Sequence, residues 1–348
     1  MTRGLTSTRW GALDGRPVLH HRLENALGWS LEVCDAGATL TGLRVPDRHG
    51  VLEDVLLGHE RLDDLLHGQG FLGSIVGRCA NRIAGARFTL DGVVHELTPN
   101  EGSNQLHGGP DGFHRRVWTA HPIDRDDGVA LALSYTSPHG DQGHPGTLEA
   151  EIVYTLGDAG ELRTEMTARA DRPTLCNLAQ HAYWNLGGHR AGALEQHSLR
   201  LQARRRLAVD SQLIPTGDIV PVAGTRFDFT EARALDGAFD DDFLLDGPPD
   251  ASGLRSVAVV THAPSGRWME LQSDQAHCQL YTGDGLDGSE RGKHGAHYPS
   301  RAGFCLETQA APDAVNHPGW DAPLLRPGAT YRHVMVTRFG VDRDGRQG

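Results

Sequence analysis

The chain has 348 residues, with 33 Lys or Arg and 45 Asp or Glu, so its formal net charge is −12. This length suits two average domains or one large β domain, and the acidic balance argues against nucleic acid or an anionic membrane surface as a partner. No apolar run approaches the ~20 residues of a membrane helix, and the N-terminal segment lacks the apolar core of a secretory signal, so we expect a cytoplasmic protein.

Short alternating segments, typical of β-strands, follow one another along the chain. Residues 88–97 predict a hairpin whose turn is Asp91-Gly92, a dipeptide that type I′ turns prefer. Residues 148–156 and 162–170 predict a second hairpin, in which polar and less polar side chains alternate, so one face is solvated and the other buried. We expect further strands at 31–34, 129–135, 198–203, 256–261, 267–272, 303–307 and 331–339, and helix only in short pieces such as 60–66.

The spacing of these strands predicts the fold class. Strands that follow one another without alternating helices favour an all-β fold, a large antiparallel β-sandwich with few short helices, over a Rossmann or TIM arrangement. The 44 Gly and 18 Pro residues, which divide the chain into short segments, agree with this. The sequence shows neither an internal repeat nor a linker-like change of composition, so we predict a single domain over residues 1–348.

Cysteine and histidine spacing excludes the common metal and redox motifs. The five cysteines are widely spread, and no two are arranged as Cys-x-x-Cys, which argues against a thioredoxin-like pair or a zinc knuckle. No His-Glu-x-x-His helix is present. The glycine-rich stretch 283–288 has no βαβ unit around it, so a nucleotide-binding loop is not indicated. We therefore expect neither a metal nor a cofactor.

Polar and aromatic residues crowd into four parts of the chain where a plain sandwich would carry apolar ones. Amides, His, Arg and carboxylates can bind sugar hydroxyls, and neighbouring aromatic rings can cover the apolar face of a sugar. Taken singly, each segment could equally consist of turn and edge residues. The segments are 77–83 with 104–109; 177–188; 239–243; and 279–283 with 304–309 and 312–316.

Taken together and in this order, these segments resemble the aldose 1-epimerase (galactose mutarotase) family. The resemblance runs over nearly the whole chain, because the segments 35–39, 45–50, 54–58, 214–218, 224–229 and 325–331 belong to it as well. It implies a galactose mutarotase-like supersandwich that interconverts the α and β anomers of hexoses such as glucose or galactose. That reaction opens a cyclic hemiacetal and closes it on the other face, which requires an acid and a base, each worth ~10²–10⁴-fold.

The matching motifs imply roles for seven residues. Glu307 is implied as the base, which requires a raised pKa. His181 is implied as the acid, and its ordinary pKa near neutrality leads us to expect that modest shifts hold it protonated. The residues implied to bind the sugar are His107, Asn81, Arg82, Asp240 and Gln279.

This chain departs from the family pattern at two places. The family usually has Asp-His-Asn where residues 240–242 are all Asp, so the match of Asp240 could shift by one position. The family commonly has Phe where Trp184 stands, and that ring could either cover the sugar or pack in the core.

Two other functions remain open at this stage. A glycoside hydrolase could use Glu307 and Asp240 as its two carboxylates, and a noncatalytic carbohydrate-binding or sugar-sensing module could share the fold. The expected partner is a monosaccharide, and the expected state is a monomer or weak homodimer. The sequence leaves open which aldose is preferred and whether phosphorylated sugars are accepted.

Overall fold

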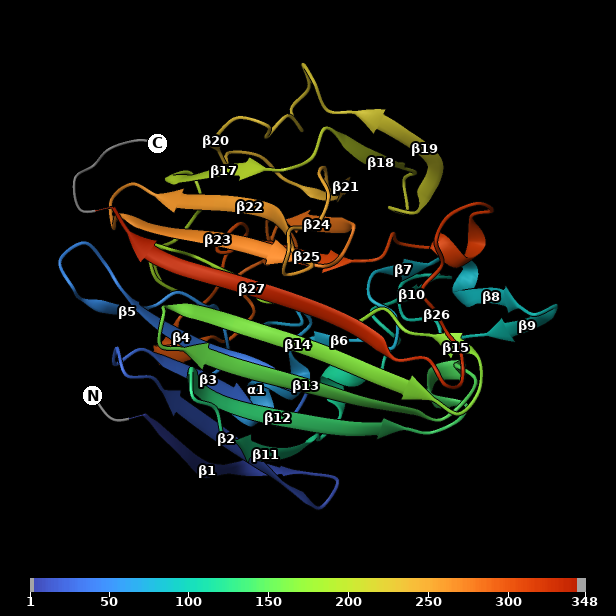
Figure 1. Cartoon of the computed structure of the whole chain (residues 1–348), viewed down its shortest axis with the longest axis horizontal. Helices are drawn as coiled ribbons and strands as arrows, with labels where there is room; N and C mark the ends of the chain where they lie inside the picture. Colours follow the sequence, from blue (N-terminus) through green and yellow to red (C-terminus); the bar gives the residue numbers. More distant parts are fainter. Residues whose placement is uncertain (1–2, 343–348) are drawn as a thin grey trace.

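The structure is a computed structural model that describes residues 3–342, and antiparallel β-sheets make up most of it (Figure 1). The N-terminal sheet is a meander of five strands in chain order. Its strands are β1 (Gly4–Leu13), β2 (Arg16–Glu24), β3 (Ser30–Cys34), β4 (Thr39–Pro46) and β5 (Leu52–Asp54).

The largest sheet has nine strands in the order β11-β12-β13-β14-β27-β23-β22-β17-β20. The C-terminal strand β27 lies in its middle, between β14 and β23 (Figure 1). The bounds are β11 (Thr119–Ile123), β12 (Gly128–Ser137), β13 (Leu148–Gly157), β14 (Glu161–Ala170), β17 (His197–Leu201), β20 (Arg233–Ala234), β22 (Arg255–His262), β23 (Arg267–Ser273) and β27 (Tyr331–Val341).

A third sheet of five strands, in the order β19-β18-β21-β24-β25, carries much of the candidate site. Its strands are β18 (Arg205–Val209), β19 (Pro215–Pro221), β21 (Asp240–Leu244), β24 (His277–Tyr281) and β25 (Cys305–Gln309). Short strands form four small pairs: β6 (Ile75–Val76) with β16 (Ala179–Gln180), β7 (Arg82–Ile83) with β10 (Gln105–Leu106), β8 (Arg87–Leu90) with β9 (Val93–Glu96), and β15 (Thr174–Leu175) with β26 (Leu324–Leu325).

Helices are few and short. The one α-helix in the described part of the chain is α1 (Leu62–His67), which buries Leu62 and Leu65. The 3₁₀ turns are η1 (Ala84–Ala86), η2 (Phe113–Arg115), η3 (Asp141–Gly143), η4 (Lys293–Gly295) and η5 (Ala314–Asn316). No helix among residues 3–342 is long and apolar enough to cross a membrane.

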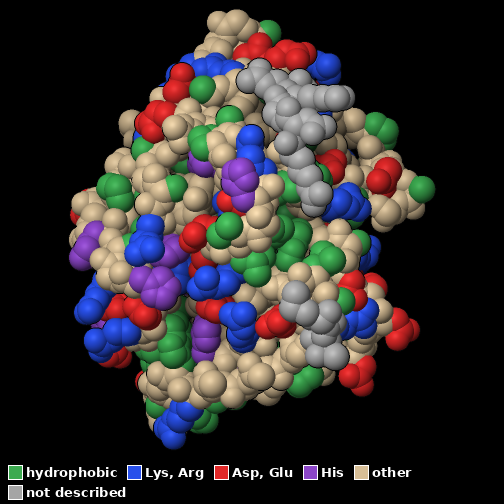
Figure 2. Space-filling model, turned by 90° about the vertical axis from the view of Figure 1, so that its left-hand side faces the viewer, with side chains coloured by type: hydrophobic (Ala, Val, Ile, Leu, Met, Phe, Trp, Pro, Cys, Tyr) green, Lys and Arg blue, Asp and Glu red, His purple; other side chains and the backbone are tan. Residues whose placement is uncertain are grey.

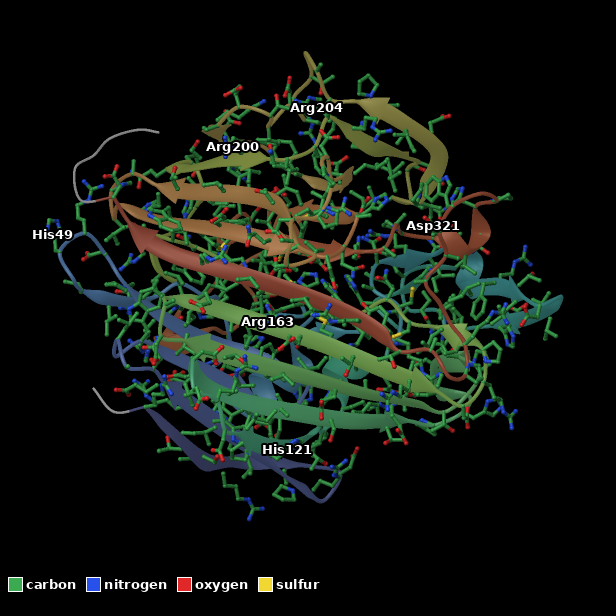
Figure 3. The ribbon with its side chains drawn as sticks, in the orientation of Figure 1. His49, His121, Arg163, Arg200, Arg204 and Asp321 are labelled. Carbon is green, nitrogen blue, oxygen red and sulfur yellow. The ribbon has the colours of Figure 1, made fainter. Side chains whose placement is uncertain are left out.

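The main hydrophobic core is shared by all three large sheets. It contains Leu31 of β3, Ile152 of β13, Val260 of β22, Phe243 of β21 and Leu306 of β25, all of which are buried. Outward-facing side chains alternate with the buried ones, as period-two strands require. Arg163 of β14, labelled in Figure 3, lies on the solvent side of the large sheet. On the face shown in Figure 2, acidic and basic side chains are interspersed.

The predicted β fold is confirmed, and so are its two hairpins. Leu90 pairs with Val93 across the predicted turn, and Asp91 and Gly92 both have positive φ, as type I′ geometry demands. β14 alternates strictly between half-buried and buried residues over most of its length. The predicted strand 303–307 begins later and ends at Gln309, which places Glu307 in the middle of β25 rather than at its end.

Candidate active site

A cavity of about 330 Å³ opens beside the third sheet, and all seven predicted site residues line it. This volume lies within the range of small-molecule sites. The seven residues are Asn81, Arg82, His107, His181, Asp240, Gln279 and Glu307. They come from six separate stretches of the chain, so the fold brings together what the sequence spreads over more than two hundred residues.

Three neighbouring strands present polar side chains to this cavity from one face of the sheet. Gln279 of β24 lies directly opposite Glu307 of β25, and Tyr281 lies opposite Asp240 of β21. Because side chains alternate between faces with a period of two, these four residues share a face. The side chains between them, such as Leu280 and Leu306, point into the main core. The core therefore fixes the register that gathers the polar residues.

Asn81 and His107 reach the cavity from two adjoining turns held together by the β7–β10 pair. The backbone N–H of His107 donates to the carbonyl of Asn81 at 3.0 Å, and the backbone N–H of Asn81 donates to Nδ1 of His107 at 3.2 Å. Both residues have positive φ, 60° and 52°. Since Nδ1 of His107 accepts a hydrogen bond, the ring proton of neutral His107 lies on Nε2.

His181 follows β16 and is held in place by backbone bonds on both sides. Its N–H donates to Ser74 and its carbonyl accepts from Gly73, both at 2.9 Å. Its Nε2 lies 3.7 Å from Oε1 of Glu307, and both side chains are almost fully buried. The ring of His107 stands nearly perpendicular to the ring of His181, with centroids 5.0 Å apart. A carboxyl and an imidazole thus meet at the floor of the cavity.

The three consecutive aspartates have three different surroundings, which settles the register of this segment. Asp240 lines the cavity and accepts a hydrogen bond from Nε2 of Gln279 at 2.6 Å. Asp241 pairs with Arg206 at 3.2 Å. Asp242 is buried and bonds to Nδ1 of His277 at 2.6 Å and to Gln309 at 3.0 Å. Asp240 is therefore the one of the three that faces the cavity.

Arg82 is bound on two sides by carboxylates. Its Nε and Nη2 donate to the two oxygens of Glu101 at 2.7 and 2.8 Å, and its Nη1 lies 3.8 Å from Oδ2 of Asp240. A two-point pair of this kind fixes the plane of the guanidinium as well as its charge. Glu101 lines the cavity and was not predicted as a site residue.

Burial shifts the pKa values of the two central groups in opposite directions. The pKa of the Glu307 carboxyl is raised well above its ordinary value, mainly by burial and further by Asp240. Burial lowers the pKa of His181 to about 4. For the site without sugar, the expectation that His181 is held protonated was wrong. Burial removes solvent from the imidazole and disfavours its charged form, which the ordinary pKa does not take into account. Between these two pKa values the pair carries one proton.

Aromatic rings line the cavity, but Trp184, for which the sequence left both a sugar-covering and a core position open, is not among them. Trp184 is buried in the main core and packs against Phe339 at 5.5 Å between ring centroids, so its role as a sugar-covering ring is excluded. The rings that line the cavity are Phe71, Tyr183 and Tyr281. Phe71 lies 4.9 Å from the ring of His107 and 5.7 Å from that of His181. Phe71 lies outside the polar motifs, so the sequence pattern gave no signal for it.

Three of these side chains also form a geometry that a metal ion could use. His107, His181 and Glu307 each offer a ligand atom, and these atoms all lie within 4.8 Å of one another. Two imidazoles and a carboxylate are a donor set that suits zinc. Motif spacing could not reveal this cluster, because its members come from three distant segments.

Comparison with known proteins decides the family. The family model for aldose 1-epimerase matches residues 20–338. Galactose mutarotase from Bos taurus is 41% identical over 319 residues, covering 89% of this chain and 91% of its own.

The chain belongs to the aldose 1-epimerase family. Aldose 1-epimerase from Escherichia coli is 35% identical over 343 residues, covering 94% of this chain and 97% of its own. The solved structure of a GalM/aldose epimerase homologue from C. elegans superposes with a TM-score of 0.85 at 28% identity, covering 98% of this chain and 99% of the other. The predicted family and the predicted β fold are confirmed. The predicted class of enzyme, an aldose 1-epimerase and thus an isomerase, is confirmed as well.

Proposed function

We propose that this protein interconverts the α and β anomers of an aldohexose such as glucose or galactose by acid–base opening and closure of the sugar ring. The observation that carries the proposal is the buried pair of Glu307 and His181, 3.7 Å apart, at the floor of a cavity of about 330 Å³. The family supplies the reaction class, and the pair supplies the two proton-transfer groups that this reaction requires.

In the proposed reaction Glu307 takes the proton of the C1 hydroxyl while His181 gives a proton to the ring oxygen. The bond between C1 and the ring oxygen breaks, and the aldehyde forms at C1. Rotation about the C1–C2 bond then presents the other face, and the two protons return as the ring closes. The starting form has an ionised Glu307 and a protonated His181, and a C1 hydroxyl that donates to the carboxylate favours this form.

The remaining polar residues bind the sugar in this proposal. Nε2–H of His107 is a donor for a sugar oxygen, because Nδ1 already accepts from Asn81. Asp240 accepts from hydroxyls, and the amide of Gln279, which holds Asp240 at 2.6 Å, keeps its oxygen as a further acceptor. Arg82 offers Nη1, the nitrogen that Glu101 does not bind.

The cytoplasmic location and the monomeric or weakly dimeric state belong to the same proposal. An enzyme that converts one anomer of a monosaccharide into the other needs no second subunit, because the seven site residues all come from one chain. Size-exclusion chromatography over a range of protein concentrations tests the oligomeric state.

The decisive experiment follows the optical rotation of freshly dissolved α-glucose and α-galactose. We expect the protein to accelerate the approach to the equilibrium rotation without releasing any product. A hydrolase would instead liberate reducing ends from a glycoside, and a binding module would do neither. A folded protein that accelerates the exchange of no fresh aldose would contradict the proposal.

A further inference from the structure

The charges around the cavity are strongly unequal. Among the described residues that line it, Arg82 is the only Lys or Arg. Five carboxyl groups line the same cavity: Glu101, Asp240, Asp287, Glu290 and Glu307. The response of this site to an anionic ligand therefore depends on whether Arg82 is free to bind it.

Arg82 is not free, because Glu101 occupies two of its three nitrogens. The two bonds, 2.7 and 2.8 Å long, use the same edge of the guanidinium that binds carboxylates and phosphates at two points. The third nitrogen, Nη1, lies 3.8 Å from Asp240, so carboxylates face the guanidinium group on both sides. The Arg82 side chain is only 9% exposed, which leaves it little room to swing to another partner.

Glu101 is itself held in position by a tight turn. Its carbonyl accepts from the N–H of Asn104 at 2.9 Å, and its own N–H donates to the carbonyl of Asn104 at 3.2 Å. The buried side chain of Asn104 accepts in turn from the N–H of Gly85 at 3.0 Å. The turn therefore presents Glu101 to Arg82 from a fixed backbone.

We propose that Glu101 is a specificity-determining residue that restricts this cavity to uncharged sugars. It neutralises Arg82, the one Lys or Arg among the described residues that line the site, and so excludes aldoses that carry a phosphate or carboxylate group. An anion would have to displace Glu101 or stand unpaired among the other carboxylates, and both are unfavourable. This inference rests on the proposed function, and it makes Glu101 a positioning residue for Arg82 as well.

Glu101→Gln tests the proposal, because it removes the charge and keeps the shape. Binding of inorganic phosphate is measured by ³¹P NMR titration at constant ionic strength, a readout that does not depend on activity. We expect the affinity for phosphate to rise by about tenfold or more. We also expect KM for galactose to rise more than kcat falls, because Arg82 loses its orientation. Glu101→Ala is a second variant with the same expected gain in phosphate binding.

Asp287→Asn is the matched control. Asp287 lines the same cavity, is exposed, and forms neither a hydrogen bond nor an ion pair with Arg82. Its Oδ1 accepts from the N–H of Ser289 at 2.8 Å. Removing its charge should change phosphate affinity by less than about twofold, since an exposed charge is screened by solvent. The double variant Arg82→Gln, Glu101→Gln should lose the gain, which shows that the gain acts through Arg82.

Two results would overturn the proposal. One is an equal rise in phosphate affinity in Glu101→Gln and Asp287→Asn, and the other is an unchanged phosphate affinity in both Glu101 variants. The kcat/KM of the wild-type protein for galacturonate supplies a second arm, and we expect it to be at least about a hundredfold below that for galactose. A wild-type protein that accelerates no aldose refutes the proposed function. A wild-type protein that is active on galactose and equally active on galacturonate refutes only the role of Glu101.

Discussion

Glu307 and His181 show how burial, more than direct charge pairing, prepares an acid–base pair. Loss of solvent is the largest cause of the shift for both groups, and it raises the pKa of the carboxyl and lowers the pKa of the imidazole. Oε2 of Glu307 is buried with no hydrogen-bond partner among residues 3–342, so it is available to a sugar hydroxyl. The cost of burying this oxygen is thus offset only when substrate is bound.

These directions predict the pH dependence of anomer exchange. Below the pKa of His181, about 4, both groups are protonated and the site has no base. Above the raised pKa of Glu307 both groups are deprotonated and the site has no acid. We expect kcat/KM to fall on the acid side near pH about 4 and to form a plateau above it, which the rate of rotation change in a series of buffers measures. An acid limb near the ordinary histidine pKa of ~6.5 would contradict this assignment.

At the level of residues, motif order was enough to find seven of the polar residues that line the cavity. It could not find Glu101 or Phe71, because the former lies in a turn of polar residues and the latter lies outside the motifs. It also misjudged the protonation of His181, since burial depends on what the fold packs around the ring. Trp184 lies inside a matching motif, yet its ring packs in the main hydrophobic core and not in the cavity.

At the level of elements, the turn after β10 positions the His107 ring through close backbone contact. Gly108 follows His107 and has a φ of +83°, and a Cβ there would lie 1.9 Å from the carbonyl oxygen of Gly77. Only glycine allows this approach, because it has no Cβ. The segment that carries Gly77 leads directly to Asn81, so this contact also bears on the position of Asn81.

Gly108→Ala should therefore destabilise the protein and displace His107. We expect a loss of at least about 3 kcal/mol in the free energy of unfolding, since strain and a backbone clash act together. Gly92→Ala is the control, because Gly92 has a similar φ of +81° but open space around its Cβ position. It should cost only ~1–2 kcal/mol. Urea unfolding measures both variants, and equal losses would show that the clash is relieved elsewhere.

β13 and β14 were predictable from their alternation, whereas the exposed strand β19 and the two-residue strand β7 were not. β13 alternates between buried and more exposed residues over 148–154, and β14 over 161–168, so their periodicity stood out. β19 is exposed along most of its length, and β7 has only two residues, so neither has an apolar face to reveal it. Yet β7 carries Arg82, which means that an element too short for its own pattern positions a site residue.

At the level of the whole molecule, the order of strands in the sheets could not be read from the sequence. β27 pairs with both β14 and β23, so the C-terminal strand joins the two halves of the large sheet. The three large sheets then share one core, which includes residues of β3, β13 and β21. Pairings between segments this distant follow from side-chain packing, which local patterns do not record.

The shared core predicts that the chain unfolds as a single domain. We expect the change in far-ultraviolet circular dichroism and the change in tryptophan fluorescence to coincide in one urea transition. Trp29 and Trp118 both belong to the common core, so their emission reports on its loss. Two separated transitions would instead divide the chain and contradict the prediction of one domain over residues 1–348.

The central claim is that Glu307 is the base, and Glu307→Gln tests it most directly. Anomeric exchange NMR on galactose should show a loss of about 10²–10⁴-fold in kcat for the folded variant. Its thermal unfolding should be close to that of the wild type, because the amide keeps the shape of a buried group. Glu149→Gln on the exposed side of β13 is the matched control and should keep full activity. Near-wild-type exchange by folded Glu307→Gln would contradict the account.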